Sequence, residues 1–105
     1  MNGRKGVEDE LEVLTVCGVG MGSSLILRMT AEEVFKQLDL RAHVTATDVS
    51  SARGMRADIL IGQELHTPEF IGLVPIVISV ANFLDKDEMK AKLVAAMEAA
   101  GWMAA

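Results

Sequence analysis

The 105-residue chain has no tyrosine, one tryptophan, three phenylalanines and a single cysteine. Because aromatic side chains are scarce and half of the residues are hydrophobic, we expect a core of Val, Ile, Leu, Ala and Met. The lone cysteine excludes a disulfide within the chain and is typical of a reducing cytoplasm. A chain of this length predicts one domain with one core.

Further absences narrow the range of functions. No apolar run approaches the roughly 20 residues that a membrane-spanning helix needs, and the first ten residues are too polar for a signal peptide. A net charge of −5 without a Lys/Arg cluster argues against nucleic acid as a partner. The two histidines, His43 and His66, are too far apart in the sequence to form a zinc motif with one cysteine. We therefore expect a cytoplasmic protein with no metal, no cofactor and no segment inserted in the membrane.

Strand-like and helix-like segments alternate through residues 11–105, after a polar tail that we expect over residues 1–10. The apolar runs predict four strands: Leu11–Val16, Ala42–Val49, Ala57–Gly62 and Val74–Val80. Alternation with helices implies parallel pairing through right-handed crossovers. We predict a Rossmann-like α/β domain with a four-stranded parallel sheet, order 2-1-3-4, and helices on both faces.

Two long helices are predicted, one over Leu25–Leu38 and one from Asp85 to about Ala100. In the second helix, Asp85 is the expected N-cap, Glu88 completes a pattern like a capping box, and Gly101 is the expected stop. The first helix is amphipathic, and we expect four of its apolar residues, or close neighbours, to face the sheet: Leu25, Met29, Val34 and Leu38.

The single cysteine opens a glycine- and serine-rich loop between the first strand and the first helix. The loop is Cys17-Gly18-Val19-Gly20-Met21-Gly22-Ser23-Ser24. Backbone N–H groups of such a loop, together with the positive end of the following helix dipole, form a cradle for an anion. Serine hydroxyls can donate further hydrogen bonds to phosphate oxygens. The same environment favours the thiolate form of Cys17, which makes this residue a candidate carrier of a phosphoryl group.

The loop of this chain differs from the glycine-rich and cysteine-containing loops of three other classes of phosphate-binding protein. The glycines are spaced G-x-G-x-G, whereas a dinucleotide-binding loop needs G-x-G-x-x-G, and Asp48 is a weak candidate for its ribose-binding acid. A Walker loop needs Gly-Lys-Ser/Thr, and this loop has no lysine. Low-molecular-weight cysteine phosphatases resemble C-x5-R-[ST], but Ser23 stands at the arginine position. The missing arginine, which would bind the phosphate oxygens, argues against a phosphatase-like hydrolase, but this function is kept as an alternative. A buried cysteine with a purely structural role is another alternative.

The segment from Val16 to Ser24 resembles the phosphorylation loop of the EIIB components of the bacterial sugar phosphotransferase system (PTS). The resemblance extends over about residues 11–100, including the Ala57–Ile61 strand and the Asn82–Asp85 segment. Within the system it is most similar to the ascorbate-type branch, with the galactitol and lactose/cellobiose types further off.

The resemblance implies a phosphotransferase component that works through S-phosphocysteine. Cys17 would accept a phosphoryl group from an EIIA phosphohistidine and donate it to a sugar held by the EIIC membrane permease, L-ascorbate in this branch. It implies a stand-alone cytoplasmic component that meets the membrane only through the permease. An EIIB-like regulatory module is a further alternative. The residues expected to bind phosphate are Gly18, Val19, Gly20, Met21, Gly22, Ser23 and Ser24.

Two more residues are predicted at the rim of this site. Asp48 lies at the end of the second predicted strand and His66 follows the third. Because the carboxyl ends of parallel strands meet at one edge of a sheet, both are expected on the edge where Cys17 lies.

Overall fold

The computed structural model describes the chain over residues 10–16 and 21–102, and its side chains over residues 10–16 and 25–102. All four strands are parallel and lie in the order β2-β1-β3-β4. Their bounds are β1 Leu11–Val16, β2 Ala42–Thr47, β3 Ile59–Gly62 and β4 Ile76–Ser79. The predicted fold class and strand order are confirmed.

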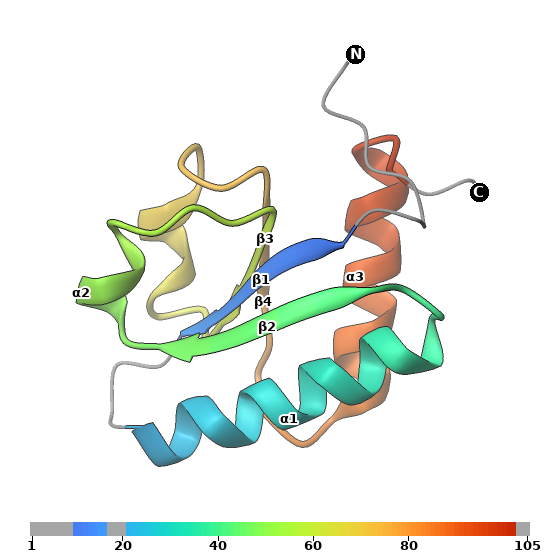
Figure 1. The fold of residues 1–105 in the computed structure, drawn as a ribbon, viewed down its shortest axis with the longest axis horizontal. Helices are drawn as coiled ribbons and strands as arrows, with labels where there is room; N and C mark the ends of the chain where they lie inside the picture. The colour runs from blue at the N-terminus through green and yellow to red at the C-terminus, as the bar shows by residue number, and fades with distance from the viewer. Residues whose placement is uncertain (1–9, 17–20, 103–105) are drawn as a thin grey trace.

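Helices cover both faces of the sheet (Figure 1). On one face lie α1 (Met21–Gln37) and α3 (Lys86–Ala99). On the other face lie the single-turn helix α2 (Val49–Ala52) and the 3-10 helix η1 (Thr67–Phe70). Within the described part of the chain, no helix is both long enough and apolar enough to cross a membrane.

Alternating side chains of the strands divide the interior into two cores, so the prediction of a single core is wrong. In β3, Ile59 and Ile61 point into the larger core beneath α1 and α3, whereas Leu60 points into the smaller core beneath α2 and η1. Residues of β3 are buried on both faces, which is why this strand reads as a continuous apolar run.

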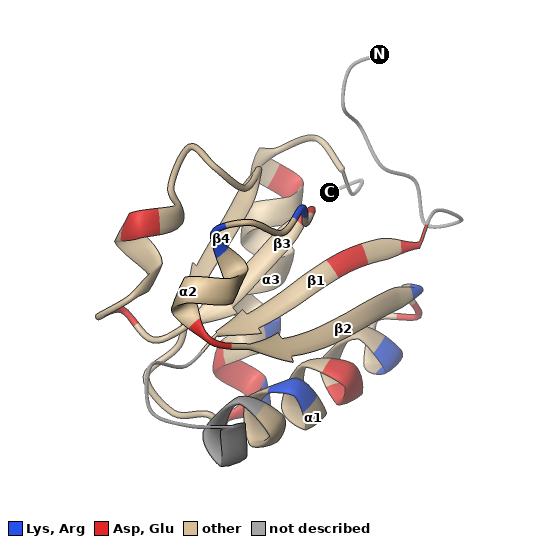
Figure 2. Ribbon diagram, turned by 60° about the vertical axis from the view of Figure 1, so that its left-hand side comes forward, with Lys and Arg blue, Asp and Glu red and all other residues tan. Residues whose placement is uncertain are grey.

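The orientation of α1 differs from the prediction. Val34 is buried and Leu38 is half-buried, as expected, but Leu25 and Met29 are 40% and 64% exposed. Residues nine apart in an α-helix differ by about 180°, so Leu25 and Val34 cannot share a face. The side chains of α1 that are buried beneath the sheet are Leu27, Thr30, Ala31, Val34 and Phe35. Charged residues lie on the outer side of the helix (Figure 2).

The ends of α3 largely follow the prediction. Asp85 is the N-cap, and its Oδ1 accepts a hydrogen bond from the Glu88 N–H at 3.0 Å. The helix ends before Gly101, which has a φ of 78°. The capping box is wrong in one respect, because the Glu88 carboxylate does not return to the Asp85 N–H. It accepts instead from the backbone N–H groups of Ala81 and Asn82, at 3.2 and 3.3 Å.

Three strands are shorter than predicted, each for a local reason. β2 ends at Thr47 because Asp48 caps α2. β3 begins at Ile59, after Asp58, whose carboxylate accepts a hydrogen bond from the Glu12 N–H at 2.9 Å. β4 begins after Pro75, which lacks a backbone N–H for the sheet.

Candidate functional site

The carboxyl ends of the four strands meet along one edge of the sheet. Val16 of β1 pairs with Thr47 of β2 and with Gly62 of β3, and Gly62 pairs with Ser79 of β4. Helix α1 begins at Met21, four residues earlier than the predicted Leu25, so Met21, Gly22, Ser23 and Ser24 belong to its first turn and not to a loop as predicted. Only the four residues 17–20 join this edge to the start of the helix. In open α/β sheets, ligands bind at this kind of edge.

The predicted phosphate loop falls largely outside the described residues. Positions 17–20, which include Cys17, are not described, and of positions 21–24 only the helical backbone is described. The assignment of Cys17 and its loop therefore stays a prediction from the sequence. What the structure describes is the strand before the loop, the helix after it and the neighbouring strand ends.

Gly62 lets the chain pack closely against the end of β1. A Cβ atom at this position would lie 3.1 Å from the carbonyl oxygen of Val16 and 3.4 Å from Cγ2 of Thr67. The Thr67 Oγ1 and Ser79 Oγ atoms are 2.5 Å apart, so a hydrogen bond also joins η1 to the end of β4. The segment after β3 is thereby held against the strand that leads into the predicted loop.

His66 is half-buried and directly precedes Thr67, as the residue before η1. Its Nε2 atom is buried, and no described atom is within hydrogen-bonding distance and geometry of it. His66 therefore lies beside a residue that contacts the end of β3, at the expected edge. Its role at the rim of the site stays a prediction.

Asp48 is the N-cap of α2 and therefore has a structural role. It follows the last residue of β2, and its Oδ1 accepts a hydrogen bond from the Ser51 N–H at 2.7 Å, which caps α2. The hydrogen bond from the Ser51 backbone holds the pKa of Asp48 below its ordinary value. This capping accounts for the residue, and a further role at the rim stays a prediction.

The sequence analysis missed Lys92, which reaches the carboxyl edge from α3. Its Nζ donates to the Ser79 carbonyl oxygen at 2.7 Å and to Glu88 Oε2 at 3.0 Å. The hydrogen bond from Lys92 is the main cause that lowers the pKa of Glu88. Lys92 and Ser79 line a hollow of about 320 Å³ together with Gln63 and Ala81. The i,i+4 spacing of glutamate and lysine was the available sequence signal.

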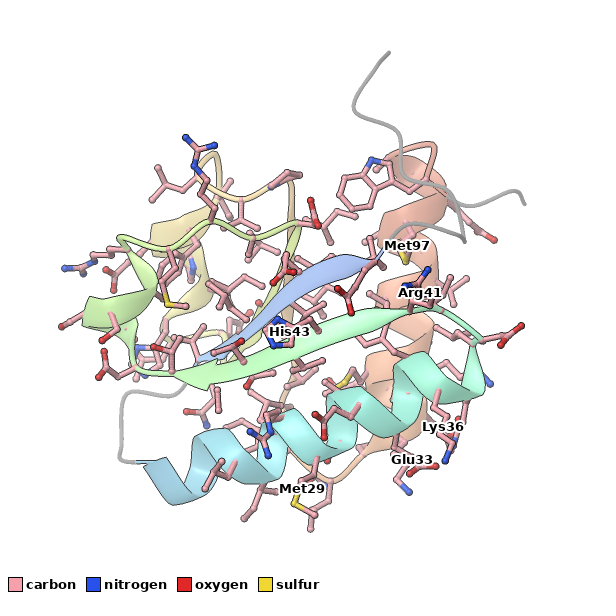
Figure 3. All side chains as sticks on the ribbon, viewed as in Figure 1. Met29, Glu33, Lys36, Arg41, His43 and Met97 are labelled. Carbon is pink, nitrogen blue, oxygen red and sulfur yellow. The ribbon has the colours of Figure 1, made fainter. Side chains whose placement is uncertain are left out.

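The remaining histidine, His43, and the arginine of α1, Arg28, each lie beside a glutamate. His43 lies on β2 (Figure 3). Its Nδ1 atom is 3.1 Å from Glu12 Oε1, and that hydrogen bond raises the pKa of the exposed His43. Arg28 Nε lies 3.8 Å from Glu32 Oε2, one turn along α1. Among the described residues, no group of three or more His, Cys, Asp and Glu side chains could hold a metal ion.

Comparison with known proteins decides the family. A family model described as the PTS system, Lactose/Cellobiose specific IIB subunit, matches residues 12–95. The chain belongs to this IIB family. PTS IIB proteins are phosphotransferase components of sugar transport that act with EIIA and EIIC partners.

Two individual proteins are also similar to this IIB chain. The Ascorbate-specific PTS system EIIB component of Mycoplasma pneumoniae is 33% identical over 86 residues, which cover 79% of this chain and 90% of that protein. The lactose-specific IIB domain of the PTS from Streptococcus pneumoniae superposes with a TM-score of 0.54 at 16% identity. That match covers 86% of this chain and 93% of the other, and it shows a shared fold.

Proposed function

We propose that this IIB protein carries a phosphoryl group on Cys17, from an EIIA phosphohistidine to a sugar bound by an EIIC permease. The observation that carries the proposal is the cysteine that follows β1 and begins a glycine- and serine-rich segment, which continues into the first turn of α1, in a chain of the IIB family. The 33% identity to an ascorbate-specific component supports L-ascorbate as the sugar. The reaction would take place on the cytoplasmic side of the permease.

Two displacements at phosphorus make up the proposed reaction. In the first, the Cys17 thiolate attacks phosphorus, an S–P bond forms, and the N–P bond of the donor breaks with its electron pair returning to the imidazole. In the second, a sugar hydroxyl oxygen attacks, loses its proton, and displaces the thiolate. The phosphoryl group passes on without loss to water, and Cys17 is regenerated for the next transfer.

The elements around the loop supply the groups that such a reaction needs. The first N–H groups of α1 have no partner within the helix and can donate to phosphoryl oxygens, with the helix dipole favouring negative charge there. Ser23, six positions after the cysteine, stands where phosphatases have their arginine clamp. Without that clamp we expect slow hydrolysis, which suits an intermediate that is handed on.

Intact-mass measurement tests the phosphorylation step. The chain is incubated with phosphoenolpyruvate, Enzyme I, HPr and an ascorbate-type EIIA, and we expect the mass to rise by one phosphoryl group. The Cys17→Ser variant should fold with an unchanged circular dichroism spectrum and gain no phosphoryl group. A phosphorylated Cys17→Ser protein, or an unmodified wild type with loaded EIIA of each PTS branch, would contradict the proposal.

A second measurement tests the sugar. Phosphorylated protein is mixed with membranes that contain an ascorbate-type EIIC permease, and the loss of its phosphoryl mass is followed with L-ascorbate or lactose. We expect loss only with L-ascorbate. Loss of the group in buffer alone, together with turnover of p-nitrophenyl phosphate, would favour the phosphatase-like alternative.

A further inference from the structure

Four large aliphatic side chains lie exposed around one side of the candidate site. They come from α1, from the β3–η1 connection and from the β4–α3 connection. We call this surface the apolar trough, and its residues and exposed fractions are Ile26 45%, Met29 64%, Leu65 80% and Leu84 71%. In Figure 3, Met29 points away from the sheet, on the outer side of α1.

Three adjoining hollows make this surface continuous. The first, which Leu65 and Lys92 line, shares Gln63 with a second hollow of about 470 Å³. The second shares Ile26 and Leu84 with a third hollow of about 320 Å³. Residues on the rim of the third include Met29, Glu33 and Lys86. The trough therefore runs from the carboxyl edge of the sheet along the first turns of α1.

The trough lies next to the proposed phosphoryl site. Gln63 follows Gly62, which pairs with the last residue of β1, one position before Cys17. Ile26 and Met29 lie about 7 and 12 Å along α1 from its start, at 1.5 Å per residue. A protein that brings an imidazole into contact with Cys17 would therefore cover this surface.

The β4–α3 connection is held in place rather than loosely attached. Leu84 N–H donates to Asn82 Oδ1 at 2.9 Å, and Asp85 N–H donates to the Asn82 carbonyl oxygen at 3.1 Å. The Glu88 carboxylate binds two N–H groups just before this turn. The exposed Leu84 is thus presented on an ordered turn, which lowers the entropic cost of binding a partner.

The size of the trough indicates a transient partner. Four partly exposed aliphatic side chains present a few hundred Å² of apolar surface, about the largest patch seen on ordinary monomers. A stable homodimer commonly buries 2,000 Å² or more, whereas brief encounters bury less than about 1,200 Å². Lys86 and Glu33 at the rim add charge around an apolar centre, the usual composition of a protein interface.

We propose that the apolar trough is the docking surface for the phosphohistidine-bearing EIIA donor. This inference rests on the proposed role of Cys17. The donor must bind and leave once in each transfer, which matches a small apolar surface beside the thiol. The donor must also hold its imidazole in line with the sulfur of Cys17. Contacts between the donor and the trough, on one side of the site, would help to orient the imidazole.

The test compares charge introduced at the trough with the same change at matched positions elsewhere. The trough variants are Met29→Glu and Leu84→Glu. The matched controls are Leu73→Glu and Ile71→Glu, whose side chains are 67% and 72% exposed and lie between η1 and β4, away from the trough. The initial rate of phosphoryl uptake is measured against the concentration of loaded ascorbate-type EIIA. Alkylation of Cys17, the only thiol, by iodoacetamide checks that the loop is intact.

We expect each trough variant to raise the EIIA concentration for half-maximal rate about tenfold, because a buried carboxylate without a partner opposes docking. The maximal rate should change less than about twofold, and the two controls and the alkylation rate should match wild type. If wild type is phosphorylated and the trough variants behave like the controls, the docking proposal fails while the role of Cys17 stands. If only transfer to the permease slows, the trough belongs to the acceptor and the proposal is overturned. Lack of phosphorylation in wild type itself would contradict the proposed function first.

Discussion

Gly62 shows at the scale of one residue how the fold prepares the edge of the sheet. Because Gly62 has no side chain, the Val16 carbonyl oxygen and the Thr67 side chain can both lie close to its backbone. A Cβ atom at this position would be 3.1 Å from the Val16 oxygen and 3.4 Å from Thr67 Cγ2. The sequence placed this glycine at the end of a buried strand but did not show what it contacts. That contact depends on pairing between β1 and β3, whose residues are more than forty positions apart.

A branched side chain at this position should therefore destabilise the protein. We expect Gly62→Val to lower the free energy of unfolding by about 1–3 kcal/mol, because the added methyl groups press on backbone that cannot easily move. Urea denaturation followed by circular dichroism measures the change. Gly54→Ala is the control, since a Cβ there would meet only the Ser51 carbonyl oxygen at 4.0 Å, and we expect a change within about 0.5 kcal/mol. Equal destabilisation of both variants would contradict this account of Gly62.

At the scale of elements, the ends of α3 were more predictable than the face that α1 buries. Asp85 and Gly101 bound α3 as predicted, because capping depends on residues only a few positions apart. The buried face of α1 was predicted only in part, because the helix carries two apolar stripes. The stripe that contains Val34 packs against the sheet, whereas the stripe that contains Leu25 and Met29 is exposed.

Glu88 and Lys92 of α3 form hydrogen bonds with residues at and just after the end of β4, and we call this contact the α3–β4 link. Its contribution to the stability of the protein should depend on pH. Hydrogen bonds from Lys92 and from the Ala81 backbone hold the pKa of Glu88 below its ordinary value of 4.5. A carboxyl group whose pKa is lowered by folding stabilises the folded state above the unfolded pKa, and this contribution disappears as pH falls through the folded pKa. We expect Glu88→Gln to lower stability at about pH 7, with a difference from wild type that shrinks steadily below about pH 4.5.

Urea denaturation across this pH range measures the effect of Glu88. Glu98→Gln, an exposed position in the last turn of α3, is the control and should show a smaller dependence on pH. A difference between wild type and Glu88→Gln that is the same at every pH would show that the charge of Glu88 contributes nothing to the link.

At the scale of the whole molecule, the two cores share the strands β1, β3 and β4. Leu60 and Phe70 lie in the smaller core, whereas Ile59 and Trp102 lie in the larger one. Because neighbouring residues of one strand enter different cores, neither core can be lost without loosening the sheet. We therefore expect the domain to unfold in a single cooperative step.

Trp102, the only tryptophan, allows this cooperativity to be measured from the larger core. Phe70→Ala, in the smaller core, should lower the free energy of unfolding by about 3–5 kcal/mol. The Trp102 fluorescence transition in urea should shift by the same amount as the circular dichroism transition, and the milder Phe70→Leu should shift both by less. A Trp102 transition that stays at the wild-type midpoint would show that the two cores unfold separately.

The order of strands and helices, the parallel pairing and the family were all readable in the sequence. Alternating apolar and amphipathic segments permit few topologies, and the cysteine loop is a local motif of eight residues. The tertiary structure decided which face of α1 is buried and that Lys92 reaches the end of β4. It also gathered the apolar trough from three separate segments. These features depend on distances between residues remote in the chain, which no local pattern of residue types can specify.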